Sequence, residues 1–485
     1  MIGFRALRDL RVLRVCFLCA VLGVPVWAQT LPDRTRPPTL APTPQLDLPG
    51  IQKRALSNGL AVWLVESHEV PIVQVNVVVK AGAGDDPAGK FGTASLTAAM
   101  LDEGAGTRSA LDIADAVEFL GASLTTTSSF DASAVRLNVP SGRLREALPV
   151  LADVTLRPAF PAKELERLRQ ERLTSLLQAR DDPASIAPMA FSRIVFGAHR
   201  YGTGAIGTEA TLKVLSTGDL SAFHAAYYQP SNAVLVVVGD IKADAILPDL
   251  EKQFGSWKAA AAPRRAPVPA APQLASGGIY IVDKPEAEQS QIRIGWVGVP
   301  RSTPDYFPLL VLNTILGGSF TSRLNQNLRE EHGYAYGASS GFDMRLSAGP
   351  FVAAAGVQTD KTAESVREFF NELMGITEPI GAEEIARAKN YIALGFPAEF
   401  ESSADLSRRL EELIVYQLPD GYFERYIATV QATTAEALQK AAKTYIQPSR
   451  FAVVVVGDRK TIEPGIRALN LGPVRVMSVE EALGL

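Results

Sequence analysis

One segment of this chain occurs twice. Residues 227–240 read YYQPSNAVLVVVGD and residues 445–458 read YIQPSRFAVVVVGD, with nine of fourteen positions identical and no gap. In each copy a helix is expected to end at Gln-Pro, and a β-branched strand then runs into Gly-Asp. The second copy begins 218 residues after the first. This spacing indicates two duplicated domains of about 200 residues each in a chain of 485.

Two proline-rich stretches mark the limits of these domains. Residues 29–50 and 258–276 combine proline with threonine or alanine and carry no apolar period, which is typical of a tether and a semi-rigid linker. The predicted domains therefore span residues 51–257 and 277–485. In the first domain we expect strands over 61–66, 73–80 and 133–139, and helices over 92–102, 109–120, 144–154 and 162–179. Helices and strands do not strictly alternate, which favours an α+β fold of two homologous α/β sandwiches over a doubly wound sheet.

The first 28 residues are predicted to be a secretory signal peptide. Four arginines precede an apolar run that ends in a small-residue cleavage site near Ala28, and the run is too short to span a bilayer. Cys16 and Cys19 both lie in this segment, so the mature chain has no cysteine. Removing its net charge of +3 changes the charge from −4 to −7. We therefore expect a periplasmic or secreted protein with no membrane span and no nucleic-acid partner.

Most of the candidate motifs fail on inspection. Residues 84–90 (GDDPAGK) resemble a phosphate-binding loop, but Phe91 stands where Ser or Thr is needed, and Asp85 and Asp86 would repel phosphate. A turn between strand and helix is the better interpretation. None of the four histidines lies at metal-ligand spacing from another, and each is expected to be a surface or hydrogen-bonded core residue. They are His68, His199, His224 and His332.

Four segments together resemble one family. They are residues 56–60 (LSNGL), 92–104 (GTASLTAAMLDEG), 283–285 (DKP) and 317–336 (GGSFTSRLNQNLREEHGYAY). They resemble the insulinase, pitrilysin and mitochondrial-processing-peptidase family of zinc peptidases, over roughly residues 48–470 in order. The resemblance implies two α+β domains in the chain, and two such units that enclose a chamber for a peptide substrate.

The zinc motif of that family is degenerate in this chain. Active members carry His-x-x-Glu-His on a helix of the first half, where two histidines bind zinc and the glutamate activates water. Aligned on the flanking glycines, this sequence has Ser95, Ala98 and Ala99 at those places. The third ligand, a glutamate, should lie in residues 172–177 (RLTSLL), where Glu171 is the nearest carboxylate and is expected to be a solvated helix residue. We therefore expect no catalytic residue, metal ligand or cofactor of the chain's own.

A second functional pair of the family is retained. Arg329 and Tyr336, with Gly333 at the turn, fit the family's Arg-x-x-x-Gly-x-x-Tyr signature. By resemblance they reach across to the zinc centre and bind carbonyl oxygens of the peptide near the cleaved bond. Some bacterial members are pairs in which one subunit supplies zinc and the other supplies this arginine and tyrosine.

The leading hypothesis is a zinc-free subunit, inactive alone, that forms a heterodimer with a zinc-bearing homologue and completes its peptidase site. One alternative is a non-enzymatic pseudopeptidase that binds peptides or acts as a structural scaffold. An independent zinc peptidase is a third interpretation, and it requires replacement ligands that the sequence does not offer.

Overall fold

The computed structural model describes residue 42 and residues 46–258 and 268–484. The predicted signal peptide lies outside these residues, as do most of the predicted tether and residues 259–267 of the predicted linker. Residues 268–276 contain neither helix nor strand. No helix in the described part of the chain is long and apolar enough to cross a bilayer.

The first half is built around a six-stranded mixed sheet of order β1-β2-β8-β3-β7-β6. Its strands are β1 (Gln52–Ala55), β2 (Ala61–Glu66), β3 (Ile72–Val79), β6 (Ser123–Ser128), β7 (Ser133–Pro140) and β8 (Ala233–Gly239). A short hairpin comprises β4 (Gly104–Ala105) and β5 (Arg108–Ser109). The helices of this half are α2 (Thr93–Ala99), α3 (Ala110–Phe119), α4 (Leu144–Leu156), α5 (Ala162–Ala179), α6 (Pro183–Phe196), α7 (Glu209–Val214), α8 (Thr217–Tyr227) and α9 (Ala243–Phe254).

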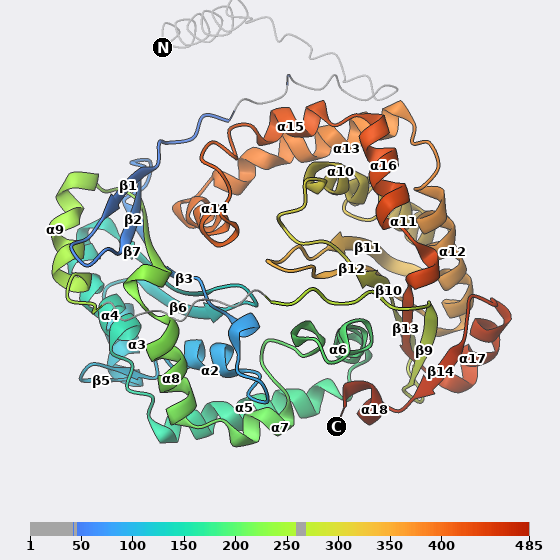
Figure 1. The fold of residues 1–485 in the computed structure, drawn as a ribbon, viewed down its shortest axis with the longest axis horizontal. Coiled ribbons are helices and arrows are strands. Elements are labelled where there is room, and N and C mark those ends of the chain that lie inside the picture. The colour runs from blue at the N-terminus through green and yellow to red at the C-terminus, as the bar shows by residue number, and fades with distance from the viewer. Residues whose placement is uncertain (1–41, 43–45, 259–267, 485) are drawn as a thin grey trace, which may run out of the picture. The chain divides into compact units, whose positions relative to one another are not determined.

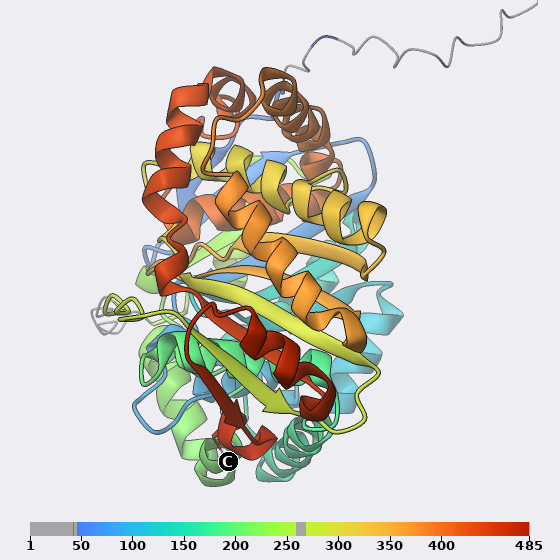
Figure 2. The same ribbon diagram turned by 90° about the vertical axis from the view of Figure 1, so that its right-hand side faces the viewer.

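The second half repeats this plan with a sheet of order β14-β9-β13-β10-β12-β11. Its strands are β9 (Gly278–Asp283), β10 (Gln289–Val297), β11 (Ala335–Phe342), β12 (Pro350–Gln358), β13 (Ala452–Gly457) and β14 (Val474–Met477). Its helices are α10 (Tyr306–Leu316), α11 (Arg323–Asn325), α12 (Thr362–Gly375), α13 (Ala382–Gly395), α14 (Ser403–Tyr416), α15 (Tyr426–Ala432), α16 (Ala435–Tyr445), α17 (Arg459–Ala468) and α18 (Val479–Leu483). Figure 2 shows α12 and α17 lying across one face of this sheet. The predicted α+β fold with two mixed sheets flanked by helices is confirmed.

The repeated sequence forms the equivalent strand in each sheet. Strand β8 pairs in parallel with β2 and antiparallel with β3, and β13 makes the same pairings with β9 and β10. Every residue of both strands is buried. In β13, Val453 and Val455 face one core while Val454 and Val456 face another. A strand covered on both faces has no solvated side, which explains its continuous run of valines.

One helix of each half packs on the sheet of the other half (Figure 1). Helix α6 packs on β10 and β13, where Phe191 lies in a core cluster with Val454. Helix α14 packs on β8 and β3, where Leu410 shares a cluster with Val236. Glu411 of α14 also accepts hydrogen bonds from Asn76 Nδ2 (2.7 Å) and Arg136 Nε (2.8 Å). The clusters around α6 and α14 therefore contain residues of both halves.

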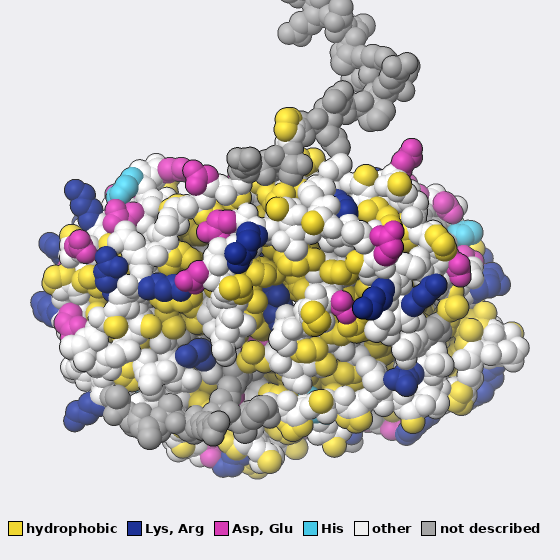
Figure 3. Space-filling model, turned by 45° about the horizontal axis from the view of Figure 1, so that its top comes forward, with side chains coloured by type: hydrophobic (Ala, Val, Ile, Leu, Met, Phe, Trp, Pro, Cys, Tyr) yellow, Lys and Arg dark blue, Asp and Glu magenta, His cyan; other side chains and the backbone are white. Residues whose placement is uncertain are grey.

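The first half differs from the sequence prediction in several elements, and two of the differences have a clear physical cause. Helix α2 ends at Ala99, whereas the prediction extended to residue 102, because the chain turns toward β4 at Gly104, whose φ of +147° is unfavourable for other residues. Strand β6 was not predicted, because its polar sequence SLTTTS lacks an apolar face. On the molecular face shown in Figure 3, basic and acidic side chains are interspersed, and hydrophobic side chains gather between them.

Candidate functional site: a degenerate zinc helix and an exposed arginine–tyrosine pair

Helix α2 carries Ser95, Ala98 and Ala99, the three residues at the zinc-motif positions. Ser95 and Ala99 are half-buried and Ala98 is buried. The helix starts after Gly92, whose φ is +98° and where a Cβ atom would lie 2.5 Å from the carbonyl oxygen of Ile206. Only glycine allows this close approach, so the turn before α2 is fixed against the loop that precedes α7.

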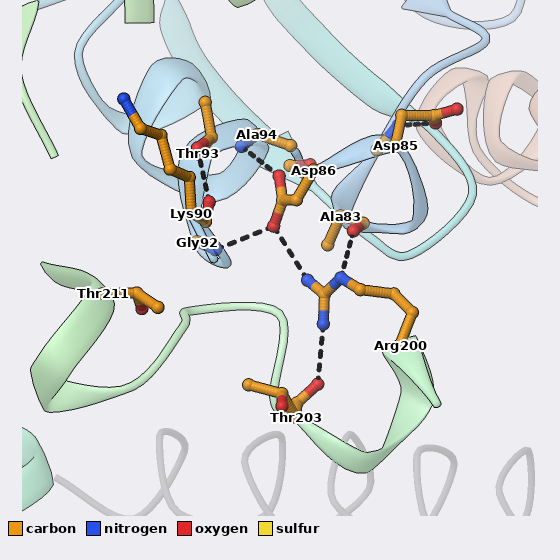
Figure 4. A network of polar contacts seen from close by, with 12 residues as sticks. Ala83, Asp85, Asp86, Lys90, Gly92, Thr93, Ala94, Arg200, Thr203 and Thr211 are labelled. Atoms are coloured by element: carbon orange, nitrogen blue, oxygen red, sulfur yellow. Dashed lines mark hydrogen bonds and ion pairs between the residues drawn. The ribbon is translucent and has the colours of Figure 1, made fainter. Parts of the chain in front are cut away.

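A buried carboxylate holds the start of α2 (Figure 4). Asp86 accepts hydrogen bonds from the backbone N–H groups of Gly92 and Ala94, both at 2.7 Å, and its side chain is fully buried. Arg200 donates to Asp86 at 2.8 Å and to the carbonyl oxygens of Ala83 and Thr203. Burial raises the pKa of Asp86, and the bonds from Ala94, Arg200 and Gly92 oppose that shift. Asp86 is thus a structural group that anchors α2.

An arginine lies beside the degenerate motif. Arg172 of α5 donates from Nη2 to the carbonyl oxygen of Ser95 at 3.0 Å. Its Nη1 atom is buried and has no hydrogen-bond partner among the described residues. Burial lowers the pKa of Arg172 to about 10, and the nearby charge of Asp86 opposes this. The guanidinium therefore remains charged at neutral pH.

The residues around α2 do not fit a zinc ion. The motif positions offer one hydroxyl and two methyl groups, and α5 presents Arg172 and the buried Leu176. Glu171 pairs with Arg167 on the exposed face of α5, as expected for a solvated residue. No group of three or more His, Cys, Asp or Glu side chains in the described residues is placed to hold a metal. The donor set is unlike the nitrogen, sulfur and carboxylate set that zinc prefers.

The four histidines have other partners. His68 contacts Asp240 at 2.8 Å, and His199 accepts a bond from the backbone of Tyr201. His224 is buried, with Nε2 at 2.9 Å from the carbonyl oxygen of Thr155, and His332 stacks on Tyr334. Each is a surface or hydrogen-bonded residue, as the sequence indicated.

An open sheet edge lies next to α2. Strand β6 is the last strand of the first sheet and pairs only with β7 in that sheet. It packs near α2, and its side chains alternate between exposed and half-buried. It contains no proline, lysine or other charged residue that would discourage pairing with a further strand. The edge can therefore accept an extended peptide by backbone hydrogen bonds.

Arg329 and Tyr336 lie together in the second half. Arg329 belongs to a π-helical turn, Gln326–Glu331, and Tyr336 belongs to β11, the edge strand of the second sheet. The Arg329 guanidinium carbon lies 5.1 Å from the centre of the Tyr336 ring and 4.6 Å from that of Phe320. Tyr336 is 89% exposed and Phe320 is 59% exposed. We call Phe320, Arg329 and Tyr336 the exposed triad.

The backbone around the exposed triad is irregular, and a buried asparagine supports it. Asn325 accepts a hydrogen bond from the N–H of Ala338 (3.1 Å) and donates to the carbonyl oxygen of Phe320 (2.7 Å). The pairing of β11 with β12 shifts register between Ala335 and Ala338, so Tyr336 lies in a bulge. Bulges and π-helical turns both redirect side chains, and both are enriched at functional sites.

The two groups of predicted residues remain separate. Among the described residues, no hydrogen bond, ion pair or ring contact joins Arg329 or Tyr336 to α2. Sequence reasoning missed the Asp86–Arg200 pair, Arg172 and Phe320. For the Asp86–Arg200 pair, the one signal in the sequence was the two acidic residues of the phosphate-loop-like segment 84–90. No sequence motif identified Arg172 or Phe320.

Models of one protein family match both halves. Residues 61–209 match the model for insulinase, peptidase family M16, and residues 215–392 match the model for the peptidase M16 inactive domain. Together the two matches cover more than half of the chain and include α2 in the first and the exposed triad in the second.

Individual relatives and structures agree with these matches. An uncharacterised zinc protease of Mycobacterium leprae is 26% identical over 429 residues, 87% of this chain and 95% of that protein. The uncharacterised zinc protease YmxG of Bacillus subtilis is 26% identical over 356 residues, 73% of this chain and 85% of that protein. A structure titled as the peptidase M16 inactive domain of Pseudomonas fluorescens superimposes with a TM-score of 0.78 at 25% identity, covering 84% of this chain and 98% of that one. A Helicobacter pylori protease shares the fold at 21% identity, with a TM-score of 0.77 over 84% of this chain and 100% of that one.

Proposed function

The chain belongs to the insulinase family, M16, of metallopeptidases, and we propose that it is a zinc-free subunit that completes the peptidase site of a zinc-bearing partner. The observation that carries this proposal is the contrast between its two sites. Helix α2 presents no metal ligands, while Arg329 and Tyr336 lie side by side on the surface.

The exposed triad has the chemistry for binding a peptide carbonyl. The guanidinium and the phenol are hydrogen-bond donors, and a pair of fixed donors stabilises the oxyanion that forms when water attacks a peptide bond. Phe320 and Tyr336 flank the Arg329 guanidinium and restrict its orientation. Because Tyr336 is 89% exposed, it is available to a site on another subunit.

The substrate proposed for the assembled pair is an extended peptide. The β6 edge offers unpaired backbone groups beside α2, which suits strand addition with little dependence on side chains. This edge also supports the second candidate function, a pseudopeptidase that binds peptides without cleaving them, because strand addition requires neither zinc nor the exposed triad.

The decisive experiment pairs the purified mature chain with a zinc-motif homologue from the same source and measures peptide cleavage. We expect turnover by the mixture to exceed that of either protein alone. Arg329→Ala and Tyr336→Phe should each reduce turnover by about 10²-fold, the typical effect of losing one oxyanion donor. Arg367→Ala is the matched control, since Arg367 is an exposed arginine of α12 whose ion pair in the described part of the chain is with its neighbour Glu368.

Three outcomes would contradict the proposal. Unchanged turnover with both variants would remove any role of the pair, and peptide binding without partner-dependent cleavage would favour the pseudopeptidase. Stoichiometric zinc and peptidase activity in the chain alone would overturn both functions.

We also propose that the subunit works in the periplasm or outside the cell, as the basic and apolar pattern of residues 1–28 predicts. Cell fractionation with N-terminal sequencing of the mature protein tests this. Recovery of the uncleaved chain from the cytoplasm would contradict it.

A further inference from the structure

Helices α2 and α5 carry the positions that the family resemblance assigns to the three zinc ligands. In this chain an arginine joins the two helices directly. Arg172 Nη2 donates to the carbonyl oxygen of Ser95, which is the residue at the first histidine position. One turn further along α5, Leu176 is buried and borders a cavity of about 350 Å³. In this chain the guanidinium of Arg172 therefore joins α2 to α5. In zinc-binding members of the family, by resemblance, ligands from the two helices would meet at the metal ion.

The charges near Arg172 leave it poorly compensated. Among the described residues, Asp86 is the carboxylate whose charge opposes the lowered pKa of Arg172, and its oxygens bind Arg200 and the backbone N–H groups of Gly92 and Ala94. Two guanidinium groups thus share one carboxylate in a half-buried region. A divalent cation placed between α2 and α5 would be repelled by this excess positive charge, and repulsion is strong where water is partly excluded.

We propose that Arg172 has taken the structural place of the metal: its guanidinium fastens α5 to α2 and keeps divalent cations out of the site. The absence of a zinc site in this subunit then has two causes, the missing ligands and the added positive charge of Arg172. Supplying the ligands alone does not restore a metal site. Arg172 is in this sense a positioning residue, because its bond to the Ser95 carbonyl holds α2 against α5.

The consequence for metal binding is tested by placing ligands in the full mature chain. Ser95→His, Ala99→His and Leu176→Glu place the three ligand types on α2 and α5, in the segments that the resemblance assigns to them. This triple variant is compared with the same triple variant carrying Arg172→Met. Both are dialysed against zinc, and bound metal is measured by mass spectrometry, with circular dichroism as the check on folding.

We expect stoichiometric zinc, and a rise in Tm on adding zinc, only in the variant that carries Arg172→Met. Equal uptake in both variants, or none in either, would overturn the proposal that Arg172 excludes the cation.

The cross-link is tested in the otherwise native chain. Arg172→Met should lower Tm clearly more than Arg145→Met, because Arg145 is an exposed arginine of α4. Equal values of Tm would overturn the cross-link. The inference shares with the proposed function the assignment of Ser95 and Ala99 to ligand positions. Its tests use the chain without a partner, so a failure here is distinguishable from a failure of partner-dependent cleavage.

Discussion

The two halves share a sheet order, but the charged side chains at their two candidate sites have opposite roles. In the first half, Asp86 and Arg200 are buried. They form an ion pair with each other and hydrogen bonds with the backbone around α2. In the second half, Arg329 lies between two exposed rings, and its one ion pair with the described residues is to its neighbour Glu330. Groups that satisfy one another maintain the fold, whereas donors left at the surface are available to a ligand. The duplicated architecture thus carries one site committed to stability and one available for binding.

Removing Asp86 should give the largest effect on stability. Asp86→Ala leaves Arg200 buried without its counter-charge and two N–H groups at the start of α2 without an acceptor. We expect a loss of about 3–5 kcal/mol in the free energy of unfolding, the usual cost of breaking a buried ion pair. Urea denaturation measures this, with the exposed Glu171→Ala as control. A loss no larger than that of the control would mean that the pair does not anchor α2.

Asn325→Ala should have an intermediate effect on stability, because the buried Asn325 side chain holds the backbone around the exposed triad. The substitution leaves the N–H of Ala338 without an acceptor and the Phe320 carbonyl without a donor. We expect a loss of about 1–3 kcal/mol in the free energy of unfolding. Asn371→Ala, on the exposed side of α12, is the control, because the side chain of Asn371 donates a hydrogen bond to the nearby Glu368 on the same helix. If the two variants unfolded alike, the bulge would not depend on Asn325.

The exposed triad itself should matter little for folding. Arg329→Ala and Phe320→Leu remove surface contacts only, so each should change the free energy of unfolding by about 0.5 kcal/mol or less. Urea denaturation of these variants, alongside the cleavage assay above, separates function from stability. A loss as large as that of Asp86→Ala would place the triad in the stabilising framework and remove the contrast between the halves.

The smallest effect should come from an exposed histidine of the first half. The hydrogen bond that the protonated His68 ring donates to the Asp240 carboxylate raises the pKa of His68 above its ordinary 6.5. The folded state therefore holds the proton more tightly, and the stabilisation is complete below about pH 6.5 and is lost as pH rises through the raised pKa. His68→Gln should remove this pH-dependent difference between about pH 5.5 and about pH 8.5, as followed by thermal unfolding. An unchanged pH profile would show that the contact does not titrate.

The sequence predicted the architecture well because its signals are repetitive. The two QPS…VVVGD segments became equivalent central strands, and the range predicted for α5, residues 162–179, matches the helix in the structure. Polar β6 escaped detection because an edge strand needs no apolar face. The site was predictable only where the family resemblance supplied positions. The Asp86–Arg200 pair joins residues 114 apart, and the Arg172–Ser95 bond joins residues 77 apart. Such pairings arise from packing and leave no local pattern.

The helix exchange described above resembles a domain swap contained within one chain. Each sheet is covered by a helix that the other half supplies, α6 on one side and α14 on the other. A half-length ancestor with this fold would have had to dimerise to bury the same surface, with both copies exchanging the helix. Fusion would have made that partnership permanent and allowed the two copies to diverge. Cleavage in the linker should therefore leave two fragments that remain associated and unfold as one cooperative unit.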